Sequence, residues 1–256
     1  MYKTKIGILC RFRKKVFLCS RKMELTEINE LTAFLSGFVS EKRLQRFDEV
    51  LEKRLSHLHI VLENLFQAHN ASAVLRSCDC FGVQHIHFIE NYNRMRISDD
   101  VAMGSSQWLT VQRYKDQSNN TRATLQSLKT QGFRIIATTP HQHEYSLENL
   151  PLDQKTALVF GTEQEGVSPE VIEEADGFVS IPMMGFTESF NVSVCAALCM
   201  YELTKRIRNE VAHPYLSEQE KAEVRLQWIK ASVDNSPALI RRFLEDKKSG
   251  SNSVRP

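Results

Sequence analysis

The sequence predicts an α/β protein with a parallel sheet covered by helices on both faces. Along the middle of the chain, short and almost continuously apolar runs alternate with segments of helical periodicity. Such runs are typical of parallel strands, because these are buried on both faces. The 256 residues, 42% hydrophobic and 25% charged, are sufficient for one α/β domain with extensions and exclude wholesale disorder.

Two helices are predicted before the first strand. Residues 25–38 show helical spacing, and five apolar side chains of residues 40–55 fall on one stripe. Ser40 can cap the second helix. Its other face carries arginines and lysines among acids, which is by default a solvated face.

The core is predicted from five strands and the helices between them. Strands are expected at residues 59–63, 85–89, 133–139, 156–160 and 178–181. Helices are expected at residues 70–82, 121–132, 168–175 and 189–208. Gly82 and Gly132 end two of these helices, and Pro169 lies in the first turn of another. Because ligands of parallel sheets bind at the carboxyl ends of strands, the loops after the strands are the candidate sites.

Two further helices are predicted near the C-terminus. Residues 217–232 open with Ser217 and, three residues later, Glu220, which together form a capping box. Residues 237–246 also have helical spacing, and residues 247–256 are expected to be disordered.

We therefore divide the chain into a basic N-terminal extension with its helix (1–56), a central α/β domain (57–209) and a C-terminal helical extension with a disordered tail (210–256). The formal charge is +2, but residues 1–22 carry eight basic and no acidic side chains, which leaves −6 for the rest. A simple polycation is excluded, so any anion-binding surface must be local. The basic segment is either an organellar presequence or sequence upstream of a functional start at Met23.

The cysteines indicate a reducing compartment. There are six, without a CxxC pair, and Cys195 and Cys199 are expected on one helix face as buried small hydrophobes rather than metal ligands. No apolar run approaches the roughly 18 residues of a membrane helix. We expect a cytoplasmic protein without a metal or a membrane partner.

Common nucleotide and hydrolase motifs are absent from the sequence, including G-x-G-x-x-G, GxxxxGK[ST], HExxH and G-x-S-x-G. Three loops carry the candidate chemistry instead. The first, residues 63–70, leads into a helix that Asn70 can cap, with Arg76 two turns further on. A buried guanidinium there needs a carboxylate or a phosphate, so Arg76 is either a ligand-binding residue or salt-bridged to a neighbouring loop.

The other two loops also join a strand to a helix. Residues 160–168 contain two glycines, which let backbone approach a ligand closely, and Glu163 at the carboxyl end of the strand. Residues 181–193 start the longest helix with hydroxyls and an amide, where free N–H groups favour polar or anionic atoms. Helix capping by Ser189 or Asn191 would account for one of these polar residues but not for all of them.

Together, HNASAVLRSCDCFGV, LVFGTEQEGVS and IPMMGFTESFNVSVCAALCMYE resemble, in order and spacing, the three motifs of the SpoU/TrmH branch of the SPOUT RNA 2'-O-ribose methyltransferases. The likeness covers roughly residues 43–215. It implies a parallel sheet whose C-terminal part threads a trefoil knot, S-adenosylmethionine as methyl donor, and a homodimer.

The resemblance also implies the site residues. The family's active-site positions match Asn70, Arg76, Glu163, Ser189 and Asn191. Positions near the methyl donor match Thr138, Gly161, Ile181, Met183 and Phe190. The expected reaction is a direct displacement that moves the methyl group to a ribose 2'-hydroxyl without a metal. Arg76 is proposed in the family to activate this hydroxyl, but its high pKa makes a phosphate-binding role the simpler interpretation.

The extensions point to tRNA as the substrate, with guanosine 18 of the D-loop as the target. The helix at residues 41–55, with Arg43, Arg46 and Arg54, resembles the basic helix of the tRNA enzymes of this branch, and His69 is expected to contact the RNA as well. Gln67-Ala68 replaces a common Lys-Pro, and Glu188 places an acid beside Ser189, which leaves substrate choice open. The alternatives are a ribosomal-RNA methyltransferase of the same branch, a catalytically silent RNA-binding relative, and an unrelated α/β nucleotide enzyme.

Overall fold

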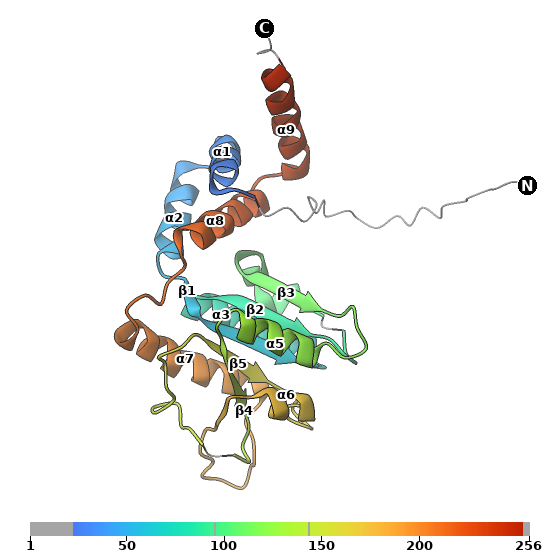
Figure 1. Ribbon diagram of the computed structural model, residues 1–256, viewed down its shortest axis with the longest axis vertical. Helices are drawn as coiled ribbons and strands as arrows, with labels where there is room; N and C mark the ends of the chain where they lie inside the picture. The colour runs from blue at the N-terminus through green and yellow to red at the C-terminus, as the bar shows by residue number, and fades with distance from the viewer. Residues whose placement is uncertain (1–22, 95, 143, 253–256) are drawn as a thin grey trace, which may run out of the picture.

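The computed structural model describes residues 23–94, 96–142 and 144–252, so the basic segment 1–22 lies outside the described residues. Its centre is an all-parallel sheet of six strands in the order β3-β2-β1-β5-β4-β6 (Figure 1). The strands are β1 (Leu55–Glu63), β2 (Val83–Ile89), β3 (Thr110–Tyr114), β4 (Arg134–Thr138), β5 (Thr156–Phe160) and β6 (Gly177–Val179). The predicted fold class is confirmed.

Two strands differ from the prediction. β1 begins at Leu55 rather than at residue 59, because the polar side chains near its start find partners: the Ser56 hydroxyl donates to the Tyr215 carbonyl at 2.9 Å. All nine residues of β1 are buried. The edge strand β3 was not predicted, because its half-exposed sequence lacks an apolar run. It follows the short helix α4 (Asp99–Ala102) and the 3-10 helix η1 (Ser105–Trp108).

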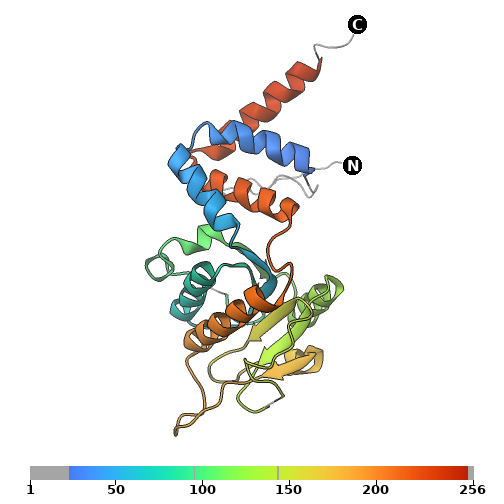
Figure 2. The same cartoon turned by 90° about the vertical axis from the view of Figure 1, so that its left-hand side faces the viewer.

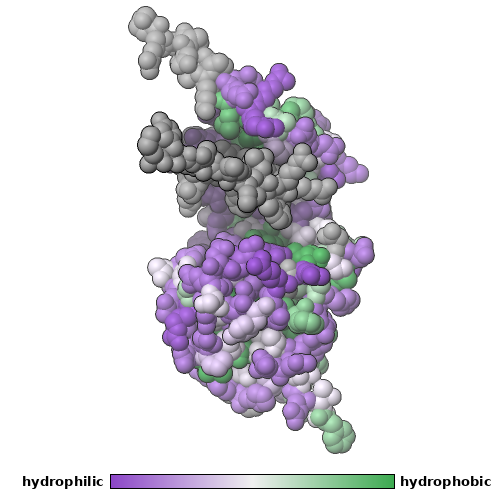
Figure 3. All heavy atoms as spheres, turned by 90° about the vertical axis from the view of Figure 1, so that its right-hand side faces the viewer, coloured by the Kyte–Doolittle hydropathy of each residue, from purple (hydrophilic) through white to green (hydrophobic). Residues whose placement is uncertain are grey.

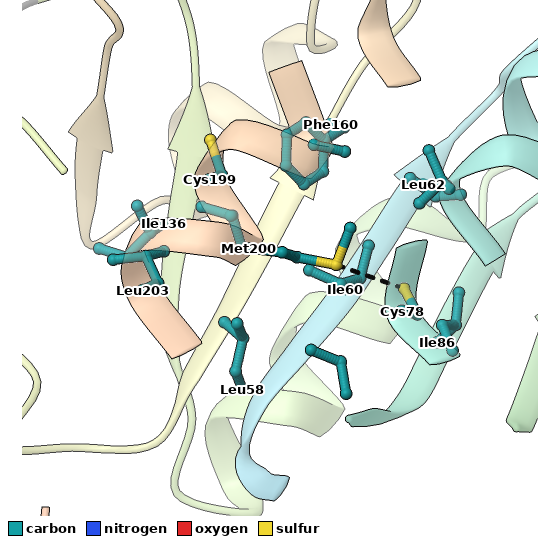
Figure 4. Packing of buried hydrophobic residues seen from close by; sticks show 14 of the residues in the cluster. Leu58, Ile60, Leu62, Cys78, Ile86, Ile136, Phe160, Cys199, Met200 and Leu203 are labelled. Atoms are coloured by element: carbon teal, nitrogen blue, oxygen red, sulfur yellow. Dashed lines mark hydrogen bonds between the residues drawn. The ribbon is translucent and has the colours of Figure 1, made fainter. Parts of the chain in front are cut away.

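Helices cover both faces of the sheet. α3 (Ala68–Phe81) and α7 (Val192–Glu210) pack on one face, whereas α5 (Thr121–Thr130) and α6 (Pro169–Glu174) pack on the other. In the core under α3 and α7, alternate residues of β1 meet apolar side chains of both helices, and the Cys78 thiol lies 3.6 Å from the Met200 sulfur (Figure 4). This packing holds the starts of α3 and α7 side by side at one edge of the sheet.

The helix ends show which capping predictions hold. Ser168 caps α6 by accepting from the Val171 N–H at 3.3 Å, and Asn191 caps α7 by accepting from the Ser193 N–H at 3.0 Å. The prediction that Asn70 caps α3 is wrong. α3 begins at Ala68, so Asn70 lies inside the first turn with its side chain free for another contact.

The N- and C-terminal extensions form one helical cluster. α1 (Leu25–Ser36), α2 (Glu41–Leu51), α8 (Glu218–Ser232) and α9 (Ser236–Asn252) share a second apolar core around Trp228 (Figure 2). The Ser217–Glu220 capping box of α8 is confirmed, whereas the Ser40 side chain makes no capping hydrogen bond. α9 extends to Asn252, beyond its predicted end at residue 246. In the described part of the chain, no helix combines the length and apolarity that crossing a membrane requires.

Three histidines are packed against one another on the sheet face opposite α3 and α7. His59 Nδ1 lies 3.0 Å from His87 Nε2, and the His59 and His85 rings stack with centroids 4.4 Å apart. Burial lowers the pKa of His87 to about 3 and also lowers the pKa values of His59 and His85. The folded protein therefore holds these rings neutral.

The histidine cluster predicts acid sensitivity. A depressed folded-state pKa means that stability is present above about pH 6.5 and is lost as pH falls toward 3, since only the unfolded chain then binds the proton. For His87 this costs about 1.4 kcal/mol per pH unit in this window. In urea unfolding at pH 7 and pH 5, His87→Gln should reduce the loss of stability by about 2 kcal/mol. His213→Gln, at an exposed position, is the matched control, and equal losses in both variants would contradict this account.

Candidate active site

Three loops that start at the carboxyl ends of β1, β5 and β6 bring together three of the predicted active-site residues. Glu163 Oε1 accepts hydrogen bonds from Asn70 Nδ2 at 2.8 Å and from Asn191 Nδ2 at 2.5 Å. Asn191 Nδ2 also lies 3.2 Å from Asn70 Oδ1. Asn70, Glu163 and Asn191 are here called the Glu163 cluster, and they lie up to 121 positions apart in the sequence.

Local structure orients each amide toward Glu163. Asn191 uses its oxygen to accept from the backbone N–H and the hydroxyl of Ser193, at 3.0 and 2.6 Å, so its nitrogen is left for the carboxylate. Asn70 is 4% exposed and also donates to Gln67 Oε1 at 3.1 Å. The two amides can therefore donate to Glu163 without rearrangement of either helix.

The loop after β5 is a tight turn that requires glycine. Thr162 and Gly166 exchange backbone hydrogen bonds of 2.8 and 3.0 Å, which places Glu163 at the exposed end of the turn. A β-carbon on Gly161 would lie 1.9 Å from the Gly166 carbonyl oxygen. Gly166 has φ +71°, in the left-handed region that favours glycine.

A cavity of about 400 Å³ lies beside the Glu163 cluster. It is lined by all five residues that the sequence predicted near the methyl donor: Thr138, Gly161, Ile181, Met183 and Phe190. Glu163 and Ser189 line it as well. This volume lies within the range of small-molecule sites, roughly 300–1,000 Å³. The loops after β4, β5 and β6 thus form one concave site, as the position of ligands in parallel sheets predicts.

The lining combines acidic and apolar side chains. Among the described residues that line the cavity, Glu163, Glu165 and Glu188 carry charge and no lysine or arginine is present. Cys195 and Cys199 contribute apolar surface from α7; Cys199 is buried as predicted, whereas Cys195 is only partly buried. The site therefore favours a ligand that combines an apolar part with a positive charge.

The loop between β6 and α7 forms the outer rim of the site and projects from the molecule. Met184 and Phe186 near its tip are almost completely exposed. In Figure 3 this tip is a hydrophobic knob at the lower end of the molecule. Ser189 lies farther along the same loop and is exposed without a hydrogen bond to the Glu163 cluster.

Arg76 is not part of this group within one chain. It lies about 9 Å further along α3 than Asn70 and is exposed. In the described part of the chain it has neither a hydrogen bond nor an ion pair, and it does not line the cavity. The alternative that Arg76 is buried and salt-bridged to a neighbouring loop is therefore wrong.

The predicted RNA-binding residues divide into two groups. Arg43, Arg46 and His69 are exposed, and Arg46 pairs with Glu49 at 3.1 Å. Arg54 is not an exposed cation: its side chain is 1% exposed, forms an ion pair with Asp79 and lies 5.2 Å from the Trp228 ring centre. Arg54 follows the end of α2, where the chain turns inward to start β1, so it faces α3 and α8 instead of solvent.

Pro140 and His141, directly after β4, also line the cavity and were missed by the sequence analysis. Neither residue belongs to a distinctive motif. Their position at the carboxyl end of a predicted strand is the signal that could have found them. In the described part of the chain, no three histidine, cysteine or carboxylate side chains are grouped so that they could hold a metal ion.

Comparison with known proteins places this geometry in a family. The chain is 40% identical over 201 residues to a tRNA (guanosine(18)-2'-O)-methyltransferase of Borreliella burgdorferi, covering 78% of this chain and 90% of the relative. A protein of the same name from Aquifex aeolicus is 35% identical, covering 74% and 90%. The crystal structure of the A. aeolicus TrmH/SpoU tRNA modifying enzyme superposes with a TM-score of 0.68 at 33% identity, over 75% of this chain and 98% of that one.

The family model that matches is described as the SpoU rRNA methylase family, and it spans residues 57–201. This match contains the Glu163 cluster, Arg76 and every lining residue of the adjacent cavity. The chain therefore belongs to the SpoU methylase family.

Proposed function

We propose that this protein transfers a methyl group from S-adenosylmethionine to the ribose 2'-hydroxyl of guanosine 18 in tRNA. The observation that carries the proposal is the cavity beside the Glu163 cluster, which gathers all five expected donor-binding residues from three loops. Relatives named for this activity match the chain over most of their own length. The target nucleotide is taken from those relatives.

The cavity suits the methyl donor in size and charge. S-adenosylmethionine supplies a methyl group attached to a positively charged sulfur. Glu163, Glu165 and Glu188 favour that positive charge, while Ile181 and Phe190 offer apolar surface. Gly161 lets the loop close tightly on Gly166, so that loop backbone lies at the cavity wall, where it can contact the donor.

The chain's own groups would position the acceptor ribose. Glu163, held by Asn70, and Ser189 at the cavity wall present polar atoms near the place where the donor and the RNA must meet. Their contribution is alignment, because holding two reactants in the reactive geometry removes much of the entropic barrier. Arg76 would hold a phosphate of the target nucleotide, and the hydroxyl proton would pass to that phosphate or to solvent.

A second copy of the chain would complete the site. On α7, Val194, Leu198 and Tyr201 are 46%, 39% and 59% exposed at spacings of four and three, which forms one apolar stripe. Since Arg76 lies outside the cavity of its own chain, we assign it to the site of the partner in a homodimer. Light scattering should give twice the 29.5 kDa of the chain, and a monomer would contradict this assignment.

The rest of the chain would serve binding and location. We assign methyl transfer to residues 57–209, and RNA contacts to the extensions 1–56 and 210–256, with Arg43 and Arg46 exposed on α2. The described cysteines Cys78, Cys80, Cys195 and Cys199 are free thiols, as in a reducing compartment, which supports a cytoplasmic location.

The deciding experiment is incubation with labelled methyl donor and either tRNA or ribosomal RNA, followed by nucleoside mapping. We expect 2'-O-methylguanosine in tRNA alone. Label in ribosomal RNA alone would identify the alternative substrate, and no label in either RNA would identify a silent RNA-binding relative.

Arg76→Ala should reduce methyl transfer by at least about 100-fold, because the guanidinium is expected to hold the reacting nucleotide. Donor affinity, measured by calorimetry, and thermal stability should stay unchanged because the side chain is exposed. Lys115→Ala, at an exposed cation outside the cavity and outside both extensions, is the control and should keep full activity. Loss of folding in Arg76→Ala would favour a structural role instead.

Gly161→Ala should weaken donor binding by about tenfold or more, because the new β-carbon would collide with the Gly166 carbonyl and displace the loop. Equilibrium dialysis with labelled donor measures the change. Gly37→Ala serves as the control, since its β-carbon would make only an ordinary contact at 3.5 Å. Unchanged affinity in Gly161→Ala would place the donor elsewhere.

A further inference from the structure

Two acids at the C-terminal end of helix α2 are paired with helix α8. Asp48 pairs with Arg225 at 2.7 Å and Glu52 pairs with Lys221 at 2.8 Å, so these acids are occupied by α8. Exposed cations remain on the other side of α2 and in the turn that follows it. Within the described part of the chain, Lys42, Arg43 and Lys53 have no acidic partner.

These cations surround a second cavity, of about 810 Å³, where α2 faces the C-terminal end of α3. Six of its lining residues are basic: Lys42, Arg43, Arg46, Lys53, Arg54 and Arg208. Asp79 is the one acid among the described lining residues, and it is already paired with Arg54. The cavity is therefore strongly positive and selects for an anion.

Its inner wall is aromatic. Phe47, Trp108 and Trp228 pack together, with the Phe47 ring 5.6 Å from each tryptophan ring, and Trp108 is partly exposed. Arg54 lines the same wall at 1% exposure, and its Nε is buried without a hydrogen-bond partner. An aromatic wall beside unpaired cations is the combination that binds a base and its phosphate.

We propose that this cavity is a binding site for a nucleoside phosphate, separate from the methyl-transfer site. The phosphate would lie against Arg43 and Lys53, and the base would stack on the aromatic wall at Trp108. The two cavities share no lining residue. The ligand is either a free nucleotide or an unstacked nucleotide of an RNA strand, which have the same chemistry here.

The chain carries its own probe of this site, because its two tryptophans both line the cavity. Guanosine monophosphate titrated into the full-length protein should change the tryptophan fluorescence saturably, more weakly as salt is raised. Ribose 5-phosphate, which lacks the base, should bind at least about fivefold more weakly. Equal affinities for the two ligands would overturn the aromatic half of the site, and absence of a saturable change would overturn the whole proposal.

The charged half is tested with Arg43→Glu/Lys53→Glu, which should weaken guanosine monophosphate binding by about tenfold or more. The matched control is Lys115→Glu/Arg241→Glu, two exposed cations outside the cavity that should leave the affinity unchanged. Equal affinities in the two double variants would contradict the proposal.

Two further readouts locate and identify the ligand. Cys80 is exposed and lines the cavity, so bound guanosine monophosphate should slow its alkylation, measured by peptide mass spectrometry. An unchanged alkylation rate would contradict the site. If tRNA displaces guanosine monophosphate, an RNA strand supplies the nucleotide, and if it does not, the ligand is a free nucleotide. Because methyl transfer is not measured, the result is independent of the proposed activity.

Discussion

The parallel pairing of β1 with β5 is the constraint on which both the scaffold and the site depend. Adjacent parallel strands end at the same edge of a sheet. Here β1 ends in Glu63 and β5 is followed by Glu163, and each of these carboxylates accepts several hydrogen bonds. Glu63, the last residue of β1, is 1% exposed and accepts from the Thr121 hydroxyl at 2.5 Å and from the Ser168 hydroxyl at 2.8 Å. It thereby holds the starts of α5 and α6 to the central strand.

Glu163, three residues beyond β5, also links the starts of two helices, but it is exposed to solvent. It connects the starts of α3 and α7, whose shared core with β1 keeps them at a fixed separation. A buried carboxylate thus fixes the scaffold, and an exposed one holds Asn70 and Asn191 together. Because both accept bonds from helix starts, a displacement of either strand would disturb the helices and the site together.

The distribution of charge separates the two ligands of the proposed reaction. The cavity beside the Glu163 cluster carries acids, which suit a positively charged donor, whereas exposed cations such as Arg43 on α2 and Arg76 on α3 lie outside it. An anionic RNA strand would therefore be attracted to those cations and not into the donor cavity. The small net charge of +2 conceals this separation.

Most of the core and the three loops could be predicted from the sequence, because buried parallel strands and glycine-containing turns have local signatures. The features that were not predicted depend on contacts between residues that are far apart in the sequence. Polar β3 is a strand only because it pairs with β2, and Arg54 is buried only because Asp79 lies opposite it. Asn70 has the chemistry of a helix cap but is used by Glu163. The trefoil knot and the homodimer that the family resemblance implies stay predictions.

The central claim is that the site beside Glu163 methylates one ribose hydroxyl, and a single atom of the substrate tests it most directly. A tRNA with a 2'-deoxy sugar at guanosine 18 lacks the proposed acceptor oxygen and is otherwise unchanged. In a single-turnover assay with labelled methyl donor, it should take up no label, while the matched tRNA with the intact ribose is methylated. Equal labelling of the two tRNAs would contradict the account.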